Sequence, residues 1–292
     1  MQIVLHTAYF LFYLVLLRLG YTLLDITLPI LHKGYVNIHP SHKKIYVCSN
    51  VLKSLMFCFY TTDALYLLYC ICVKGTWDVE RVQYLGLLYT GLDTMSLYMV
   101  PKMQLNTKIH HLSVMVLHSY CMFYNYEVGE MLKIIIVYAI WSANAYCVNL
   151  YLGLRVFIRE KNTYLHYLCC AALFTYVGCC IMNWSYQAYK IGGMMYDGTF
   201  PIGGYLYQVT MAFIIYDDIV LMKFLYSRIK NYYINRAKSA QKLQDLLTVR
   251  HNSNPTTSED TRPMLVSNNI KQNRESGYTT NVYERLYSTR RF

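Results

Sequence analysis

Residues 163–183 read TYLHYLCCAALFTYVGCCIMN, a run of 21 residues that contains no Asp, Glu, Lys or Arg. A helix of about 20 apolar residues spans the hydrocarbon core of a bilayer, so this run predicts a transmembrane helix. The whole chain has the same character, because 55% of its 292 residues are hydrophobic and only 15% are charged. Soluble domains carry about 25% charged residues. The sequence therefore predicts an integral membrane protein.

Further apolar runs extend this prediction to an all-α polytopic membrane protein with about seven transmembrane helices. Together with 163–183, the runs lie near residues 3–24, 45–73, 84–101, 110–126, 131–154 and 204–226. The fourth run is short and the second is long enough to tilt or break, so a count of six spans stays open. Because Arg18 follows the first apolar run, its charge order is the reverse of a cleavable signal peptide. We expect residues 1–30 to remain as an N-terminal transmembrane helix.

Basic residues concentrate in alternate connecting segments and in the C-terminal part of the chain. The segments His32–Lys44, Pro101–Lys108 and Arg155–Lys161 are rich in Lys and Arg. Residues 227–292 contain 12 Lys+Arg and 5 Asp+Glu, which gives +7 of the total net charge of +11. The positive-inside rule places these parts in the cytosol and the N-terminus in the lumen, in the endoplasmic reticulum or another endomembrane. Residues 236–292 are expected to form a basic, largely disordered tail, and no nucleic-acid-binding domain is predicted.

A small set of polar side chains interrupts the apolar runs. The candidates for a polar cavity are Asp93, His118, Asn144, Asn149, Asp217 and Asp218, together with the His110-His111 pair at the start of the fourth run. A charge in the hydrocarbon centre costs a few kcal/mol or more, so such residues are functional candidates unless another helix pairs them. Counted from the expected cytosolic helix ends, Asp93, His118 and the two aspartates lie about 10–13 Å deep. They are expected to form one layer that holds a polar lipid headgroup or water.

A structural role is the alternative for several of these residues. Polar side chains between membrane helices often serve only as hydrogen-bond ties, and Asn144, Asn149 and His118 fit that role. Asp217 and Asp218 point about 100° apart around a helix, so one of them is expected to face the core. A metal site is not expected, because the spans contain one His-His pair rather than several histidine-rich motifs.

Several short motifs follow one another in the order of a known membrane domain. They are the basic segment His42-Lys43-Lys44-Ile45 with Ser49 and Ser54, then Asp93, the His110-His111 pair, Asn149 with Arg155, and Asp217 or Asp218. Over residues 31–235 the chain resembles the TLC domain of translocating-chain-associated proteins, ceramide synthases and small lipid-homeostasis proteins. This resemblance implies a six-helix core, preceded here by the N-terminal helix. The membrane lipids are then the expected partners.

The resemblance leaves two functions open. Ceramide synthases carry a His-Asp-x-x-Asp motif in the next span, but Ile134–Ser142 contains neither His nor Asp. The chain is thus closest to the small non-synthase members, which implies lipid binding or regulation without a cofactor. The alternative is an acyltransferase with acyl-CoA as co-substrate and His110 or His111 as general base. Asp93-Thr94 followed by His110-His111 also gives a weaker resemblance to fatty-acid elongases.

Overall fold

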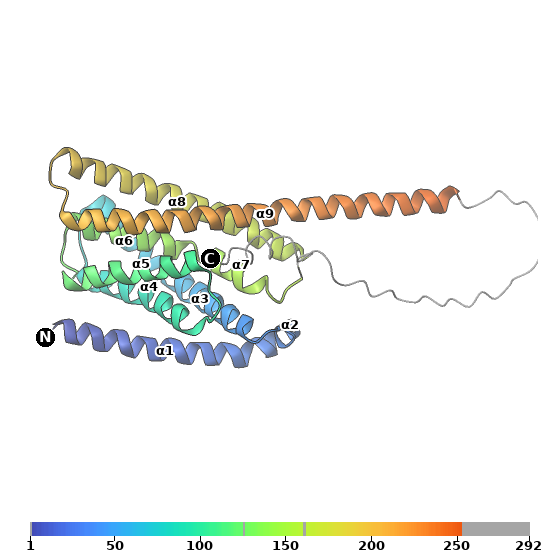
Figure 1. Ribbon diagram of the computed structural model, residues 1–292, viewed down its shortest axis with the longest axis horizontal. Helices are drawn as coiled ribbons and strands as arrows, with labels where there is room; N and C mark the ends of the chain where they lie inside the picture. The colour runs from blue at the N-terminus through green and yellow to red at the C-terminus, as the bar shows by residue number, and fades with distance from the viewer. Residues whose placement is uncertain (1, 125, 160–161, 253–292) are drawn as a thin grey trace, which may run out of the picture. The chain divides into compact units, whose positions relative to one another are not determined.

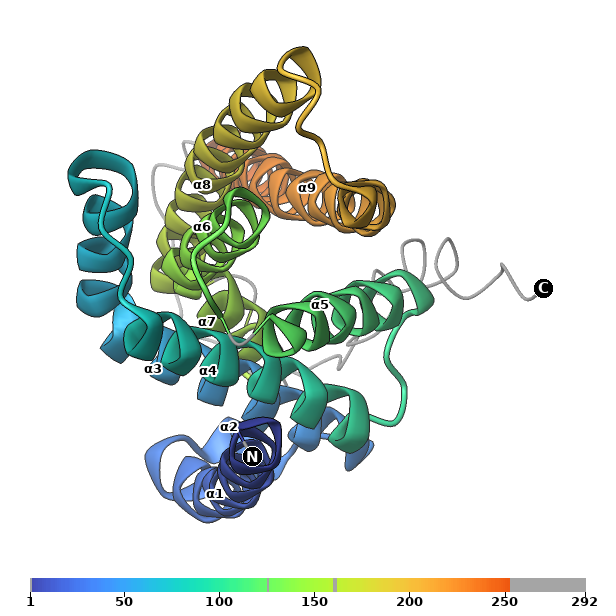
Figure 2. The same cartoon turned by 90° about the vertical axis from the view of Figure 1, so that its left-hand side faces the viewer.

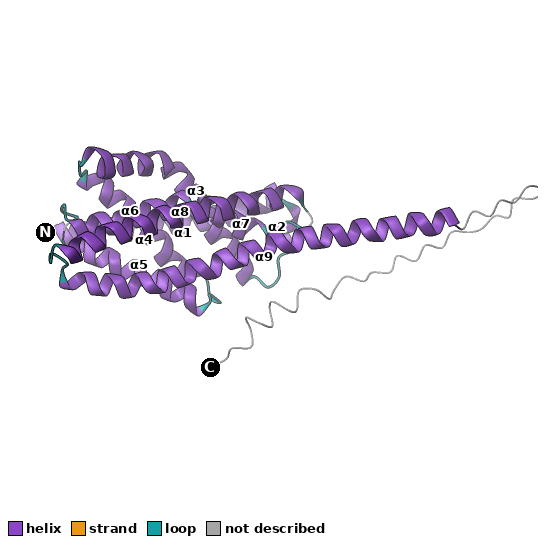
Figure 3. Cartoon of the chain, turned by 90° about the horizontal axis from the view of Figure 1, so that it is seen from above, coloured by secondary structure: helices purple, strands orange, loops and turns teal. Residues whose placement is uncertain are grey.

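The computed structural model describes residues 2–124, 126–159 and 162–252, and every regular element in these ranges is a helix (Figures 1 and 3). The elements are α1 (Gln2–Leu31), α2 (Lys33–Val36), α3 (His42–Tyr69), the π-helical turn η1 (Cys70–Lys74), α4 (Val79–Met99), α5 (Leu105–Phe123), α6 (Glu130–Asn144), α7 (Tyr146–Leu154), α8 (Thr163–Tyr196) and α9 (Ile202–Asn252). Residues up to Lys242 form one compact unit, and a second unit begins at Leu243. The predicted all-α class is confirmed for the described residues.

The helices coincide with the predicted apolar runs but begin and end elsewhere. α5 starts at Leu105, five residues before the predicted run, and α8 continues to Tyr196. The predicted run 131–154 is not one helix, because α6 and α7 meet at Ala145 with a bend of 43°. These shifts change the depth of each polar residue, because depth is counted from the helix end.

Three helices in the described residues are long and apolar enough to cross a membrane. They comprise Val4–Leu31, His42–Lys74 and Thr163–Tyr196, and the bent pair α6 and α7 makes a fourth if it forms one span. The outer face of α1 exposes large apolar side chains, namely Leu11, Phe12, Val15, Leu19 and Leu23. A continuous apolar surface of this kind is rare on soluble monomers and suits contact with lipid. The structure thus supports a helical membrane protein, while the count of seven spans stays a prediction.

Within the first unit, α1 packs against α3 and α4, and α4 packs against α5 and α6 (Figure 2). Close approach depends on small residues, as is usual in membrane bundles. A Cβ atom on Gly91 of α4 would lie 2.7 Å from Cδ1 of Tyr13 in α1. The predicted boundary between residues 1–30 and 31–235 therefore falls inside one compact unit.

The predicted tail, residues 236–292, is described only in its first part. Residues 236–252 are helical and form the end of α9. The expectation of disorder falls mainly on residues 253–292, which lie outside the described residues.

Candidate functional site

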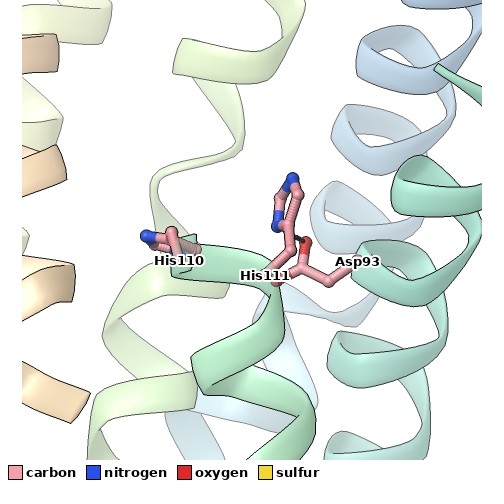
Figure 4. A group of neighbouring side chains, drawn as sticks. All are labelled: Asp93, His110 and His111. Atoms are coloured by element: carbon pink, nitrogen blue, oxygen red, sulfur yellow. Dashed lines mark ion pairs between the residues drawn. The ribbon is translucent and has the colours of Figure 1, made fainter. Parts of the chain in front are cut away.

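The short connection between α4 and α5 brings Asp93 and His111 to the same level. The two helices pack together and only residues 100–104 separate them, so they run antiparallel. Asp93 lies six residues before the end of α4 and His111 six residues after the start of α5. At 1.5 Å per residue, both lie about 9 Å from the turn. His111 Nδ1 consequently lies 3.1 Å from Asp93 Oδ1 (Figure 4).

A third helix supplies the counter-charge to Asp93. Lys53 of α3 donates a hydrogen bond from Nζ to Asp93 Oδ1 at 2.6 Å. Lys53 is 8% exposed and Asp93 is 4% exposed, so the ion pair is buried. Removal of either partner of a buried ion pair strongly destabilises a protein, because the remaining charge would stay in a medium that solvates it poorly.

The sequence reasoning missed Lys53. It lies inside the predicted run 45–73 and is a charged residue within a span. That signal was sufficient to make it a candidate, because a charge in a span needs a partner on another helix. Asp93 was such a partner.

His110 faces a different helix from its neighbour. Successive residues in a helix point about 100° apart, and the two imidazole rings are nearly perpendicular, at 86° (Figure 4). His110 Nδ1 lies 3.5 Å from Asp217 Oδ2 of α9. Asn106 of α5 also donates a hydrogen bond to Asp217 through its amide nitrogen. We refer to Lys53, Asp93, His110, His111 and Asp217 as the charged cluster.

Several buried atoms of the charged cluster have no hydrogen-bond partner among the described residues. They are Asp93 Oδ2, His110 Nδ1 and His111 Nδ1. The imidazole nitrogens lie close to carboxylate oxygens, but the contacts are not aligned as hydrogen bonds. More than nine in ten buried polar groups in proteins are paired, so three such atoms in one place are unusual. The hydrogen-bonding capacity of these three atoms is therefore not used by the described residues.

His118 does not join this layer, contrary to the depth calculation. That calculation began the helix at residue 110, whereas α5 begins at Leu105, so His118 lies about 20 Å along the helix. Its Nδ1 atom is 2.7 Å from the hydroxyl of Tyr126. The cavity beside it has a volume of about 30 Å³, which fits water but no lipid headgroup.

The other predicted residues also lie outside the charged cluster. Asp218 accepts a hydrogen bond of 2.6 Å from the Tyr176 hydroxyl of α8, so it faces away from α5. Asp218 is buried and Asp217 is half-buried, so both contact neighbouring helices, where only one was expected to face the core. Asn144 donates to the Ile140 carbonyl oxygen of its own helix, at 2.8 Å. Asn149 is half-buried in α7.

The donor atoms of Asp93, His110 and His111 all lie within 4.8 Å of one another, a spacing that a metal ion can use. The Lys53 ammonium group opposes this use, because it already occupies Asp93 Oδ1 and would repel a divalent cation. The donor set therefore suits an ion pair better than a metal. The expected absence of a metal and of a cofactor stays a prediction.

Comparison of the chain with protein-family models, with curated protein sequences and with solved structures found no match.

Proposed function

We propose that the chain is a TLC-like integral membrane protein that binds or regulates membrane lipids through the charged cluster. The main support is the presence of partnerless buried atoms on Asp93, His110 and His111 inside a bundle whose core is mainly apolar. A lipid headgroup offers polar atoms to such a cluster while its acyl chains remain among apolar side chains. No cofactor is needed for this role.

The proposed topology places the charged cluster in the cytosolic half of the bundle. It comprises seven spans, with a lumenal N-terminus and a cytosolic tail, in the endoplasmic reticulum or another endomembrane. The α4–α5 connection and the first turn of α5, which together contain the basic segment Pro101–Lys108, lie next to the cluster. This segment favours the cytosolic side. Epitope tags at both ends, probed after selective permeabilisation, test this arrangement. Two tags on the same side would contradict seven spans.

An acyltransferase is the second candidate, because each histidine of the cluster has its own carboxylate. Asp93 lies beside His111, and Asp217 lies beside His110. A carboxylate can orient an imidazole as a general base. The imidazole would take the proton of a lipid amine or hydroxyl as that group bonds to the acyl carbon of acyl-CoA. The thioester bond would break, and the CoA thiolate would leave. The cavity beside His118 is not lined by these histidines.

The experiment that tests both candidates compares two histidines of α5. The full-length protein is purified with its lipids, which are identified by mass spectrometry, and acyl-CoA transfer to a sphingoid base is measured in parallel. For a lipid-binding protein, His111→Ala is expected to lower lipid retention severalfold. For an acyltransferase, it should lower the transfer rate by about 10²–10⁴-fold.

His118→Phe is the matched control, because His118 is a buried histidine on the same helix outside the charged cluster. It is expected to leave lipid retention and transfer unchanged. If His111→Ala, His110→Ala and Asp217→Asn all behave like the control at normal protein yield, the cluster has no lipid function and serves only as a tie between helices.

A further inference from the structure

A second cavity lies between two connecting segments that are far apart in the sequence. One wall is the connection from α1 to α3, with His32, Lys33 and Asn37, and the other is the connection from α7 to α8, with Phe157 and Arg159. Its volume is about 580 Å³, within the range of roughly 300–1,000 Å³ that small-molecule sites occupy. We refer to it as the loop cavity. It shares no residue with the charged cluster.

The two walls of the loop cavity are held together by specific packing. The imidazole ring of His32 lies 5.2 Å from the Phe157 ring, centroid to centroid. His32 Nδ1 also accepts a hydrogen bond from the Gly34 amide at 3.0 Å, which caps α2. A Cβ atom on Gly34 would lie 2.7 Å from the Phe157 carbonyl oxygen, so only glycine permits this approach. The cavity is therefore a built feature between two contacting segments.

Among the described residues, each wall of the loop cavity contributes one cation. Lys33 and Arg159 face it from opposite sides, and neither forms an ion pair with another described residue. The 34-residue helix α8 begins at its rim, where Asn162 accepts hydrogen bonds from the Tyr164 and Leu165 amides. The N-terminus of a helix carries a partial positive charge, which adds to the two cations.

Part of the lining is apolar, beside the polar His32, Asn37 and Asn162. Ile38, Val156 and Phe157 contribute to the same cavity. A ligand that contacts both the cationic and the apolar side chains of the lining has an anionic group attached to a carbon skeleton. Both segments also belong to the basic connections that are expected on the cytosolic side. An anionic phospholipid of the cytosolic leaflet has this combination of charge, structure and location.

We propose that the loop cavity is a binding site for a phosphate group, contacted by Lys33 and Arg159 on opposite walls. The lipid-borne phosphate of a phospholipid headgroup and free inorganic phosphate share this chemistry. Arginine and lysine are the usual partners of phosphate, and contacts between charged donors and phosphate are the stronger class of hydrogen bonds. The site does not depend on the proposed function of the charged cluster.

The test uses native mass spectrometry of the full-length protein in detergent. Three probes are titrated: dioctanoyl phosphatidic acid, dioctanoylglycerol, which lacks the phosphate, and inorganic phosphate as a competitor. One phosphatidic acid is expected to bind per chain, with dioctanoylglycerol at least about tenfold weaker. The double variant Lys33→Gln, Arg159→Gln is expected to weaken phosphatidic acid binding by a similar factor. Lys33→Arg keeps the charge and should retain binding. Retained binding would show that substitution at this position does not by itself disrupt the fold.

Lys102→Gln, Lys108→Gln is the matched control, because it removes the same charge from exposed positions outside the loop cavity. It should bind phosphatidic acid like the wild type. If inorganic phosphate displaces the lipid at comparable concentrations, the phosphate site stands and its ligand is the free ion. The proposal is overturned if the control loses binding as much as the cavity variant, if the cavity variant binds normally, or if dioctanoylglycerol binds as tightly as phosphatidic acid.

Discussion

His111 and His118 lie seven residues apart on one face of α5, yet their surroundings differ in kind. His111 lies in the charged cluster, beside Asp93 and Lys53. His118 lies beside the hydroxyl of Tyr126, in a small apolar cavity. A second uncharged contact occurs where the Tyr207 hydroxyl donates to Gln187 Oε1 at 2.5 Å. The bundle therefore has a charged region and a neutral region, and both are buried.

The charged region and the neutral region should respond differently to the loss of one partner. In the charged region, removal of one partner leaves an ion without its counter-charge. In the neutral region, removal of a hydroxyl leaves a dipole, and hydrogen bonds between membrane helices contribute about 0.6–2 kcal/mol each. The two regions should thus differ severalfold in the cost of a single substitution, although both contain well-formed contacts.

The largest effect is expected from Asp93→Asn in the charged region. Asparagine keeps the shape but removes the charge that pairs with Lys53, so we expect a loss of about 3–5 kcal/mol of stability. Thermal unfolding in detergent, followed by the loss of soluble protein, measures it. Adding Lys53→Met removes the stranded ammonium and should restore most of the lost stability. A single Asp93→Asn variant as stable as the wild type would contradict the buried ion pair.

An intermediate effect is expected from Tyr207→Phe in the neutral region. The substitution leaves Gln187 Oε1 without its donor at a position that is 7% exposed, so we expect a loss of about 1–2 kcal/mol. Tyr205→Phe is the control, because Tyr205 lies two residues away and is 60% exposed. The same unfolding assay applies. A loss as large as that of Asp93→Asn would erase the distinction between the two regions.

The smallest effect is expected from Tyr126→Phe. It removes the hydroxyl near His118 Nδ1, but the adjacent cavity of about 30 Å³ can admit a water in its place. We expect a loss of about 0.5–1 kcal/mol, measured as a small shift in the unfolding temperature. Lipid retention should be unchanged, because the charged cluster is untouched. A marked fall in lipid retention would make His118 part of the site.

The helical fold, and the choice of Asp93, His110 and His111 as candidate residues, followed from the sequence because both depend on local signals. Apolar runs of membrane length predict helices without knowledge of the neighbouring helices. Polar residues within such runs are rare, so they can be recognised as candidates from the sequence alone. The proximity of Asp93 to a histidine then depends only on a short turn between antiparallel helices. None of these steps requires a long-range contact.

The remaining features depend on helix ends and on helix pairing, which hydropathy defines poorly. The start of α5 at Leu105 rather than residue 110 moved His118 out of the expected layer. The bend at Ala145 carries no proline or glycine signal in the sequence. The contact between Lys53 and Asp93 joins residues 40 apart, and only the packing of α3 on α4 brings them together.

The adjacent residues Asp217 and Asp218 fix the rotation of α9 about its own axis within the first unit. Asp217 is bound from α5 and Asp218 from α8, in directions set by one residue of helical rotation. A rotation of α9 about its own axis would break both contacts together, whereas a small shift along the axis would strain them unequally. Insertion of one residue before Asp217 would turn the pair by about 100° and misalign both partners. The two adjacent carboxylates thus fix the rotation of α9 about its own axis. An insertion before them would disrupt this rotation, whereas an insertion after them would only lengthen the helix.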